Sequence, residues 1–279
     1  MNISLLRSKI ESYVETGNID EREAREVVGD LLSALEEGQV RAAEPVGEEW
    51  VVHRWVKQGI LLGFRVGENV ASAAPVAFHF RDRDTFPTWD PNGTDRDVRL
   101  VPGGTTVRRG AHLADEVVVM PPAYVNVGAF VGRGSMIDSH ALVGSCAQVG
   151  RSVHLSAAAQ LGGVLEPIGA LPVIVEDEAF IGGGCGIYEG TRVGAGAVLA
   201  PGVILTRGVR IYDLVRETIH AASEAHPLAV PDGAVVVPGS RRARGPFAEE
   251  HGLALQTPVI VKYRDATTDA ALTLEEALR

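Results

Sequence analysis

Aliphatic residues recur at every sixth position along the middle of the chain. The position four residues after each of them is small or β-branched in all but the last repeat of the first run. The aliphatic positions of that run are Val101, Val107, Leu113, Val119, Val125, Val131, Ile137, Val143, Val149, Leu155 and Leu161. A period of six predicts stacked coils of three short strands, with the aliphatic and the small residue both pointing into the coil.

The phase of the repeat breaks once and then resumes. Residues 162–174 contain two prolines and are expected to form a loop. The aliphatic positions of the second run are Val175, Ile181, Ile187, Val193, Leu199, Leu205 and Ile211. We therefore expect a mainly β fold, a left-handed parallel β-helix of hexapeptide repeats over residues 99–215, with the handedness taken from this class of repeat.

The segment before the repeat has helical spacing instead. Helices are expected over residues 3–15, from Asp20 to Gly38, and within 50–64. Asp20 and Glu23 resemble a capping box, and Gly38 is a stop signal. Residues 66–98 are expected to be irregular. Residues 1–98 are thus predicted to form a small α-helical N-terminal domain.

The segment after the repeat is predicted to form a short β cap over residues 216–279. Two runs rich in valine, 234–240 and 258–263, are typical of strands. The last residues, 273–279, are expected to form a short helix.

Charge and composition narrow the classes of partner. The net charge is −10, so the overall field disfavours nucleic acid and anionic membranes as partners. No apolar stretch of about 18 residues is present, and the N-terminal segment is not a signal peptide. Cys146 and Cys185 show no pairing pattern, which is typical of a reducing compartment. A cytoplasmic protein is expected.

Several segments resemble one known family. Residues 136–150 read MIDSHALVGSCAQVG, and residues 162–167 read GGVLEP. Together they resemble the tetrahydrodipicolinate N-succinyltransferase family. Shorter stretches that share the resemblance are 50–57, 153–156, 210–213, 235–239 and 259–262. The resemblance therefore spans nearly the whole chain.

The resemblance implies a CoA-dependent acyltransferase of diaminopimelate and lysine biosynthesis. Succinyl would pass from succinyl-CoA, a co-substrate, to the amine of ring-opened tetrahydrodipicolinate. No permanently bound cofactor and no metal are implied. The family architecture implies a homotrimer with active sites between subunits.

The resemblance also assigns roles to individual residues. Asp138 matches a catalytic and substrate-contacting aspartate, and Arg99 matches a substrate-binding arginine. A carboxylate is suited to take a proton from an attacking amine, and a guanidinium binds a carboxylate in a bidentate manner. The structural alternatives are a turn aspartate that accepts backbone N–H groups and a surface arginine in a charged run.

One position departs from the family pattern. Gly186 stands where some members carry a glutamate important for activity. Glu189, three residues further on, is the candidate substitute for this catalytic acid.

Two further sets of residues were weighed for a role in the reaction. Arg241, Arg242 and Arg244 form a basic cluster that is a candidate for binding the phosphates of CoA, or else a solvated loop. His140, two residues from Asp138, is interpreted as a solvent or interface histidine rather than a base.

Two other functions compete with succinyl transfer. The nearer one is acetyl transfer from acetyl-CoA to the same substrate. The more distant one is a metalloenzyme of the γ-carbonic-anhydrase type, which would need three clustered histidines. Its candidates are His112, His140 and His154, but His112 and His154 are seven hexads apart and are expected on different faces of the coil.

Overall fold

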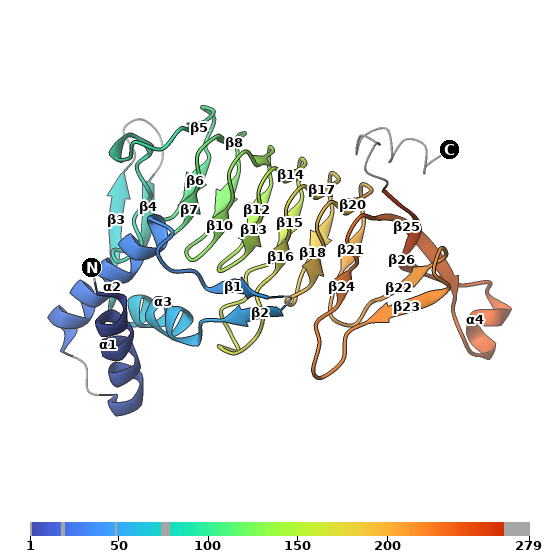
Figure 1. The fold of residues 1–279 in the computed structure, drawn as a ribbon, viewed down its shortest axis with the longest axis horizontal. Helices are drawn as coiled ribbons and strands as arrows, with labels where there is room; N and C mark the ends of the chain where they lie inside the picture. Colours follow the sequence, from blue (N-terminus) through green and yellow to red (C-terminus); the bar gives the residue numbers. More distant parts are fainter. Residues whose placement is uncertain (1, 18–19, 48, 74–78, 265–279) are drawn as a thin grey trace.

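The middle of the molecule is a stack of coils with helices near one end and a pair of long strands at the other (Figure 1). The structure is a computed structural model that describes residues 2–17, 20–47, 49–73 and 79–264. The helix expected at residues 273–279 lies outside the described residues. Among the described residues no helix has the length and apolar character needed to cross a membrane.

The coils form three parallel sheets, one on each face of a triangular prism. The first face consists of β5 (Val98–Leu100), β8 (Val117–Val119), β11 (Met136–Ile137), β14 (His154–Leu155), β17 (Phe180–Ile181), β20 (Val198–Leu199) and β25 (Ala234–Arg242). The second face consists of β6 (Thr106–Val107), β9 (Tyr124–Val125), β12 (Leu142–Val143), β15 (Gln160–Leu161), β18 (Gly186–Ile187) and β21 (Ile204–Leu205). The third face consists of β7 (His112–Leu113), β10 (Phe130–Val131), β13 (Gln148–Val149), β16 (Ile174–Val175), β19 (Arg192–Val193) and β24 (Ala229–Val230).

The predicted parallel β-helix of hexapeptide repeats is confirmed, because the repeated aliphatic positions are buried and stacked. Leu113 lies beside Val131, and Val131 lies beside Val149 on the next coil. The repeated aliphatics from Val107 to Leu205 are at most 3% exposed. The burial of these aliphatic side chains, one column on each of the three faces, stabilises the coil.

The first coil differs from the prediction by one residue. Leu100, and not Val101, pairs with Val119. Leu100 and Val98 pack against the core of the coil, and Arg99 between them is exposed. Val101 lies six residues before Val107 and Leu100 lies seven before it, so the period of six selects Val101 although Leu100 is the residue in register with Val119.

The end of the helix also differs from the prediction. Ile211 lies in β22 (Arg210–Asp213), which leaves the coil and pairs with β23 (Thr218–Ala221) and β26 (Ala254–Tyr263). The coil continues beyond residue 215, because β24 and β25 pair with β19 and β20. Ile211 is fully buried in the same apolar core as the aliphatics of the coil, so it fits the period of six although its strand pairs with β23 and β26.

The N-terminal region contains the three expected helices, α1 (Ile3–Thr16), α2 (Glu21–Glu36) and α3 (Arg54–Val66). The Asp20 side chain accepts a hydrogen bond from the N–H of Glu23 at 2.9 Å, which is the predicted N-cap. The region is less helical than predicted. Its other elements are β1 (Ala43–Val46), β2 (Glu49–Val52), β3 (Asn69–Ala73), β4 (His79–Arg83) and the short 3-10 helix η1 (Pro91–Gly93).

The helices pack on the corner between the second and third faces. Val127 and Cys146, which lie in turns at this corner, belong to the same buried cluster as the apolar residues of α1, α2 and α3. Gly128 at the same corner leaves room for Ile60, because a Cβ there would come within 2.9 Å of the Ile60 side chain. The first three coils are therefore covered at this corner.

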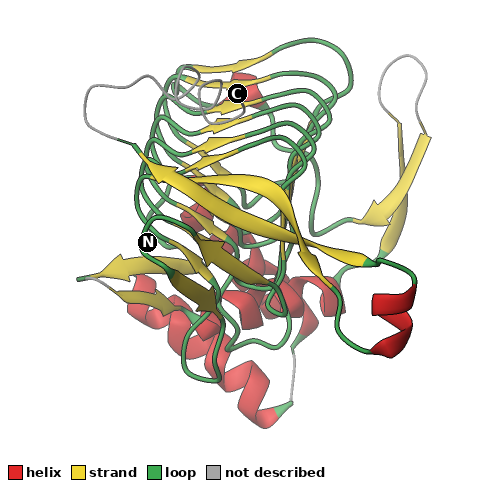
Figure 2. Ribbon diagram, turned by 90° about the vertical axis from the view of Figure 1, so that its right-hand side faces the viewer, coloured by secondary structure: helices red, strands yellow, loops and turns green. Residues whose placement is uncertain are grey.

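The C-terminal cap is built on β25 and β26, which pair antiparallel and extend past the last coil (Figure 2). The short helix α4 (Pro246–Glu250) connects them. Both strands were predicted from their valine-rich runs, although β25 also forms the last strand of the first face.

Candidate functional site

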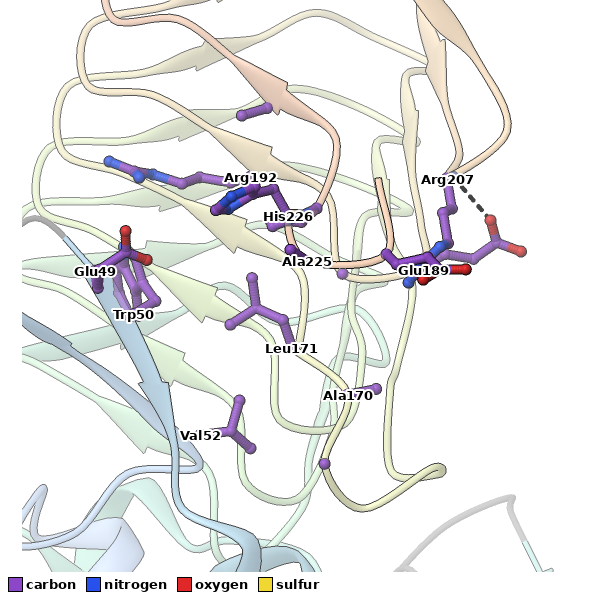
Figure 3. Close-up of a pocket in the computed structure, with 15 residues that line it drawn as sticks. Glu49, Trp50, Val52, Ala170, Leu171, Glu189, Arg192, Arg207, Ala225 and His226 are labelled. Atoms are coloured by element: carbon purple, nitrogen blue, oxygen red, sulfur yellow. Dashed lines mark hydrogen bonds between the residues drawn. The ribbon is translucent and has the colours of Figure 1, made fainter. Parts of the chain in front are cut away.

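A cavity of about 440 Å³ opens at the corner between the second and third faces, beside β2 (Figure 3). Both long insertions of the β-helix leave the coil at this corner. Residues 162–173 connect β15 to β16, and residues 206–228 connect β21 to β24. The lining residues are Glu49, Trp50, Val52, Gly169, Ala170, Leu171, Glu189, Gly190, Arg192, Arg207, Glu224, Ala225, His226, Pro227 and Ala229.

Ionic contacts hold the walls of the cavity together. Glu176 accepts hydrogen bonds from Arg192 Nε at 2.7 Å and from Trp50 Nε1 at 2.9 Å. These contacts attach β2 of the N-terminal region to the third face. On the other side, Glu189 accepts a hydrogen bond from the N–H of Arg207 at 2.8 Å. The lining thus offers both carboxylates and guanidinium groups to a polar ligand.

Asp138 lies in the turn after β11, at the corner between the first and second faces. One carboxylate oxygen accepts a hydrogen bond from the N–H of Ser139 at 2.7 Å. The other oxygen has no hydrogen-bond partner among the described residues, and the side chain is half-buried. The turn-capping role therefore occupies one oxygen and leaves the other available to a substrate.

Arg99 lies on the same face as Asp138. It is exposed on β5 and aligns with Val118, which aligns in turn with Met136. Asp138 follows Met136 by two residues. Two strand spacings and two residues of rise put the Cα atoms of Arg99 and Asp138 roughly 12 Å apart. The structure thus brings these two predicted residues to one side of the first face.

Glu189 is not brought to Asp138 within one chain. It lies in the turn after β18, at the corner between the second and third faces, and two coils beyond Asp138. Glu189 instead lines the cavity, where it is exposed. A site that uses both carboxylates would require a second subunit.

The arginine cluster lies at the far end of the cap. Arg241 and Arg242 end β25, Arg244 follows in the loop before α4, and all three are exposed. Within the part of the chain that the structure describes, none of them forms an ion pair. Their charges are therefore free to meet a phosphate.

The three histidines of the metalloenzyme alternative do not come together. His112 lies on the third face and stacks on Phe130, whereas His154 lies on the first face and stacks on Phe180. His140 lies in an exposed turn with a φ of 62°. No three His, Cys, Asp or Glu side chains among the described residues are grouped to hold a metal ion.

Two features of the site were missed by sequence reasoning. Trp50 was placed in a helix, but it lies in β2 and lines the cavity. Tyr188, two residues after Gly186, lies on the outward side of the second face against Gly186. Strand alternation predicts that positions 186 and 188 face the same way, but not that the Tyr188 ring lies over Gly186.

A coil of hexapeptides with inserted loops and a helical N-terminal region defines the class of hexapeptide-repeat transferases. A family model described as the tetrahydrodipicolinate N-succinyltransferase N-terminal domain matches residues 6–66. A second model, the hexapeptide repeat of succinyl-transferase, matches residues 172–207.

Curated relatives match over nearly the full length. The 2,3,4,5-tetrahydropyridine-2,6-dicarboxylate N-succinyltransferase of Acinetobacter baylyi is 41% identical over 91% of this chain and 89% of its own. The enzymes of that name from Sodalis glossinidius and Acinetobacter baumannii are 39% and 43% identical over 95% and 92% of this chain, and over 93% and 90% of their own. The chain belongs to the tetrahydrodipicolinate N-succinyltransferase family.

Among solved structures, a hexapeptide transferase family protein from Anaplasma phagocytophilum aligns with a TM-score of 0.41 and 15% identity. The alignment covers 66% of this chain and 85% of that one. At this level of similarity it bears on neither substrate nor mechanism.

Proposed function

We propose that this protein transfers a succinyl group from succinyl-CoA to the amine of ring-opened tetrahydrodipicolinate, in diaminopimelate and lysine biosynthesis. The observation that carries the proposal is the 41% identity to an N-succinyltransferase over 91% of the chain. The free carboxylate oxygen of Asp138 and the exposed Arg99 on the same side of the first face support it.

The transfer is direct and needs no acyl-enzyme. Asp138 accepts a proton from the substrate ammonium, and the neutral amine attacks the thioester carbonyl carbon. A C–N bond forms and the C–S bond breaks, and the second proton of the amine nitrogen passes to the departing sulfur, so that the amide forms and CoA leaves as the thiol. Asp138 suits this role because one of its oxygens is held by Ser139 while the other is free.

Arg99 orients the acceptor. Its exposed guanidinium binds a terminal carboxylate of the amino-dicarboxylate substrate through paired hydrogen bonds. The separation of roughly 12 Å between the two Cα atoms, less the reach of the arginine side chain, suits an extended substrate held at its far end. Holding that end fixes the amine beside the base, which converts binding energy into rate.

Acyl-CoA is the co-substrate, and its nucleotide end is assigned to the C-terminal cap. Arg241, Arg242 and Arg244 are exposed and without ion pairs among the described residues, so they are available to the phosphates of CoA. They are a local positive patch on a chain with a net charge of −10.

The working form is proposed to be a cytoplasmic homotrimer with sites between subunits. The helical region covers the corner between the second and third faces, whereas Val118, Met136 and Phe180 on the first face remain partly exposed. This largely apolar stripe, in which His154 lies between Met136 and Phe180, runs beside Asp138 and suits a second copy of the chain. Light scattering should give three times the mass of one chain, 29.6 kDa.

The test is CoA release with tetrahydrodipicolinate, comparing succinyl-CoA with acetyl-CoA. A strong preference for succinyl-CoA is expected. A preference for acetyl-CoA would assign the chain to acetyl transfer on the same substrate. Absence of release with either donor would overturn the acyltransferase proposal.

A further inference from the structure

Lys57 is a lysine with no exposed surface. It lies on α3 and is 0% exposed, which makes it one of the largest fully buried side chains of the protein. Its Nζ donates a hydrogen bond to the carbonyl oxygen of Ala170 at 2.6 Å. An ammonium has three N–H donors, and this carbonyl is its one acceptor among the described residues.

The environment of Lys57 does not favour its charge. It forms no ion pair with any described carboxylate. Burial lowers the pKa of Lys57, and the nearby Cys146 thiol acts in the opposite direction. A buried charge with so few partners usually costs stability, and an apolar side chain of the same size is often equal or better. Stability alone therefore gives no reason for a lysine at this position.

The acceptor of Lys57 gives the reason. Ala170 lies in the insertion 162–173, and Gly169, Ala170 and Leu171 form a wall of the cavity (Figure 3). Val52 lies across the cavity from this wall. Lys57 thus connects α3, in the core of the helical region, to the backbone of a loop that shapes the cavity.

The rest of the insertion is held at its ends and from one side. Val164 donates its backbone N–H to the Ser145 carbonyl at 3.1 Å, near the start of the loop. Leu165 packs against the helical core. Gly190 leaves room for Leu171, since a Cβ there would come within 2.5 Å of the Leu171 carbonyl oxygen. Between these points, Ala170 donates its backbone N–H to the Pro167 carbonyl at 2.8 Å, and the Arg54 guanidinium lies against Gly169. The Lys57 hydrogen bond joins the Ala170 carbonyl to α3.

We propose that Lys57 is a positioning residue that holds residues 168–171 in place as the wall of a substrate-binding cavity. It touches no substrate, and it acts through the Ala170 carbonyl. The proposal rests on the proposed function in one respect: in the proposed homotrimer the cavity, which Glu189 lines, meets Asp138 of a neighbouring subunit and so receives a substrate of the transferase.

Hydrogen exchange measured by mass spectrometry on the full chain tests the positioning directly. In Lys57→Met, peptides covering residues 163–171 are expected to exchange roughly tenfold faster, because a charge-assisted hydrogen bond is lost. Peptides of the coils at 148–160 are expected to exchange as in the parent. Lys9→Met, at an exposed lysine paired with Glu23, is the matched control and should change neither region.

A loop that exchanges as in the parent would overturn the proposal. A uniform rise in exchange rate over all peptides would also overturn it, because Lys57 would then stabilise the whole fold rather than hold this loop in position. Should Lys57→Met not fold, Lys57→Gln keeps a donor on a shorter side chain, and an intermediate rate in the loop is then expected.

Kinetics test the link to the cavity separately. If succinyl transfer is detected in the parent, Lys57→Met is expected to raise KM severalfold for the substrate that binds in the cavity. The value of kcat should fall by a smaller factor. A faster-exchanging loop with unchanged KM would sink the link to substrate binding. Because exchange needs no substrate, it reports on Lys57 even if the proposed reaction fails.

Discussion

The ring of Tyr188 lies directly against Gly186. A Cβ on Gly186 would come within 2.5 Å of Tyr188 Cε2 and 2.8 Å of its hydroxyl oxygen. A Cβ on Gly162, one coil below, would come within 2.7 Å of Tyr188 Cδ1. Two glycines thus form a notch for one aromatic ring on the second face, and the space that a longer side chain at position 186 would take is filled by Tyr188.

We expect Gly186→Ala to destabilise the protein by about 1 kcal/mol, since the added methyl group must displace the ring. In a Tyr188→Ala background the same change should be neutral or stabilising, because alanine restricts the unfolded chain more than glycine does. Urea unfolding of the two single variants and the double variant gives the coupling. Additive effects would show that the two side-chain positions do not interact.

Asp138→Asn is expected to lower kcat for succinyl transfer by 10²- to 10⁴-fold, the range for loss of a general base. The amide keeps an oxygen acceptor for the N–H of Ser139, so the turn should persist. The matched control is Asp115→Asn, at another turn aspartate that accepts a backbone N–H, from Asp97 at 3.1 Å. Near-parental turnover in Asp138→Asn would remove Asp138 from the mechanism.

Arg99→Lys is expected to raise KM for the amino-dicarboxylate by roughly 10- to 100-fold, because an ammonium cannot form the paired hydrogen bonds of a guanidinium. KM for succinyl-CoA should stay within twofold. Steady-state kinetics with each substrate varied in turn separate the two. An equal rise in both constants would contradict a role confined to the acceptor.

Replacement of Arg241, Arg242 and Arg244 by glutamine should affect the binding of succinyl-CoA and not the binding of the acceptor. KM for succinyl-CoA is expected to rise, and to rise further with salt in the parent than in the variant, since exposed charges are screened. KM for the acceptor should not change. A variant with parental KM for succinyl-CoA would leave the cluster as a solvated loop.

Asp213 is expected to make stability depend on acid pH. Burial acts to raise its pKa, but hydrogen bonds donated by Tyr263 at 2.6 Å and by neighbouring backbone and imidazole groups outweigh it and lower the pKa to about 2. A depressed pKa stabilises the folded state above the unfolded value near 4, and this contribution is lost as pH falls towards 2.

We expect Asp213→Asn to lower the free energy of unfolding by about 2 kcal/mol at pH 7, and the difference from the parent to shrink between pH 4 and pH 2. Urea midpoints across this range measure it. Glu26→Gln, at an exposed partner of the exposed Arg22, should change stability little at any pH. A difference that persists at pH 2 would mean that packing, rather than charge, is what Asp213 supplies.

The period of six predicted the coils because each inward position is repeated many times and each copy must be aliphatic. The period of six gave wrong assignments at the two ends of the coil, where no further repeats constrain the choice of residue. Leu100 and Val101 are both aliphatic, and their assignment depends on the pairing of β5 with β8, which no local pattern encodes. The strand that contains Ile211 pairs with β26, which is more than 40 residues away in sequence, so its exit from the coil cannot be predicted from spacing.

Candidate site residues could be predicted only where a residue type suited to the reaction lies in a segment that resembles the family. Asp138 and Arg99 are predicted site residues through the resemblance, and their closeness on one side of the first face follows from the register of β5, β8 and β11. The cavity was not predicted, because its walls come from β2 and two insertions whose sequences carry no repeat. Lys57 lay inside a segment that the resemblance covered, but its burial against Ala170 depends on how α3 docks on the coil.

Both insertions leave the prism along one edge, and the other two edges turn without interruption between β6 and β21. Each coil contacts only the coils before and after it, so residues added at that edge do not alter the pitch of the stack. The molecule therefore separates two kinds of variation. Insertions change the length of the chain only at the edge between the second and third faces. The regular coils keep the spacing of residues on the remaining surface constant, including the spacing between Arg99 and Asp138.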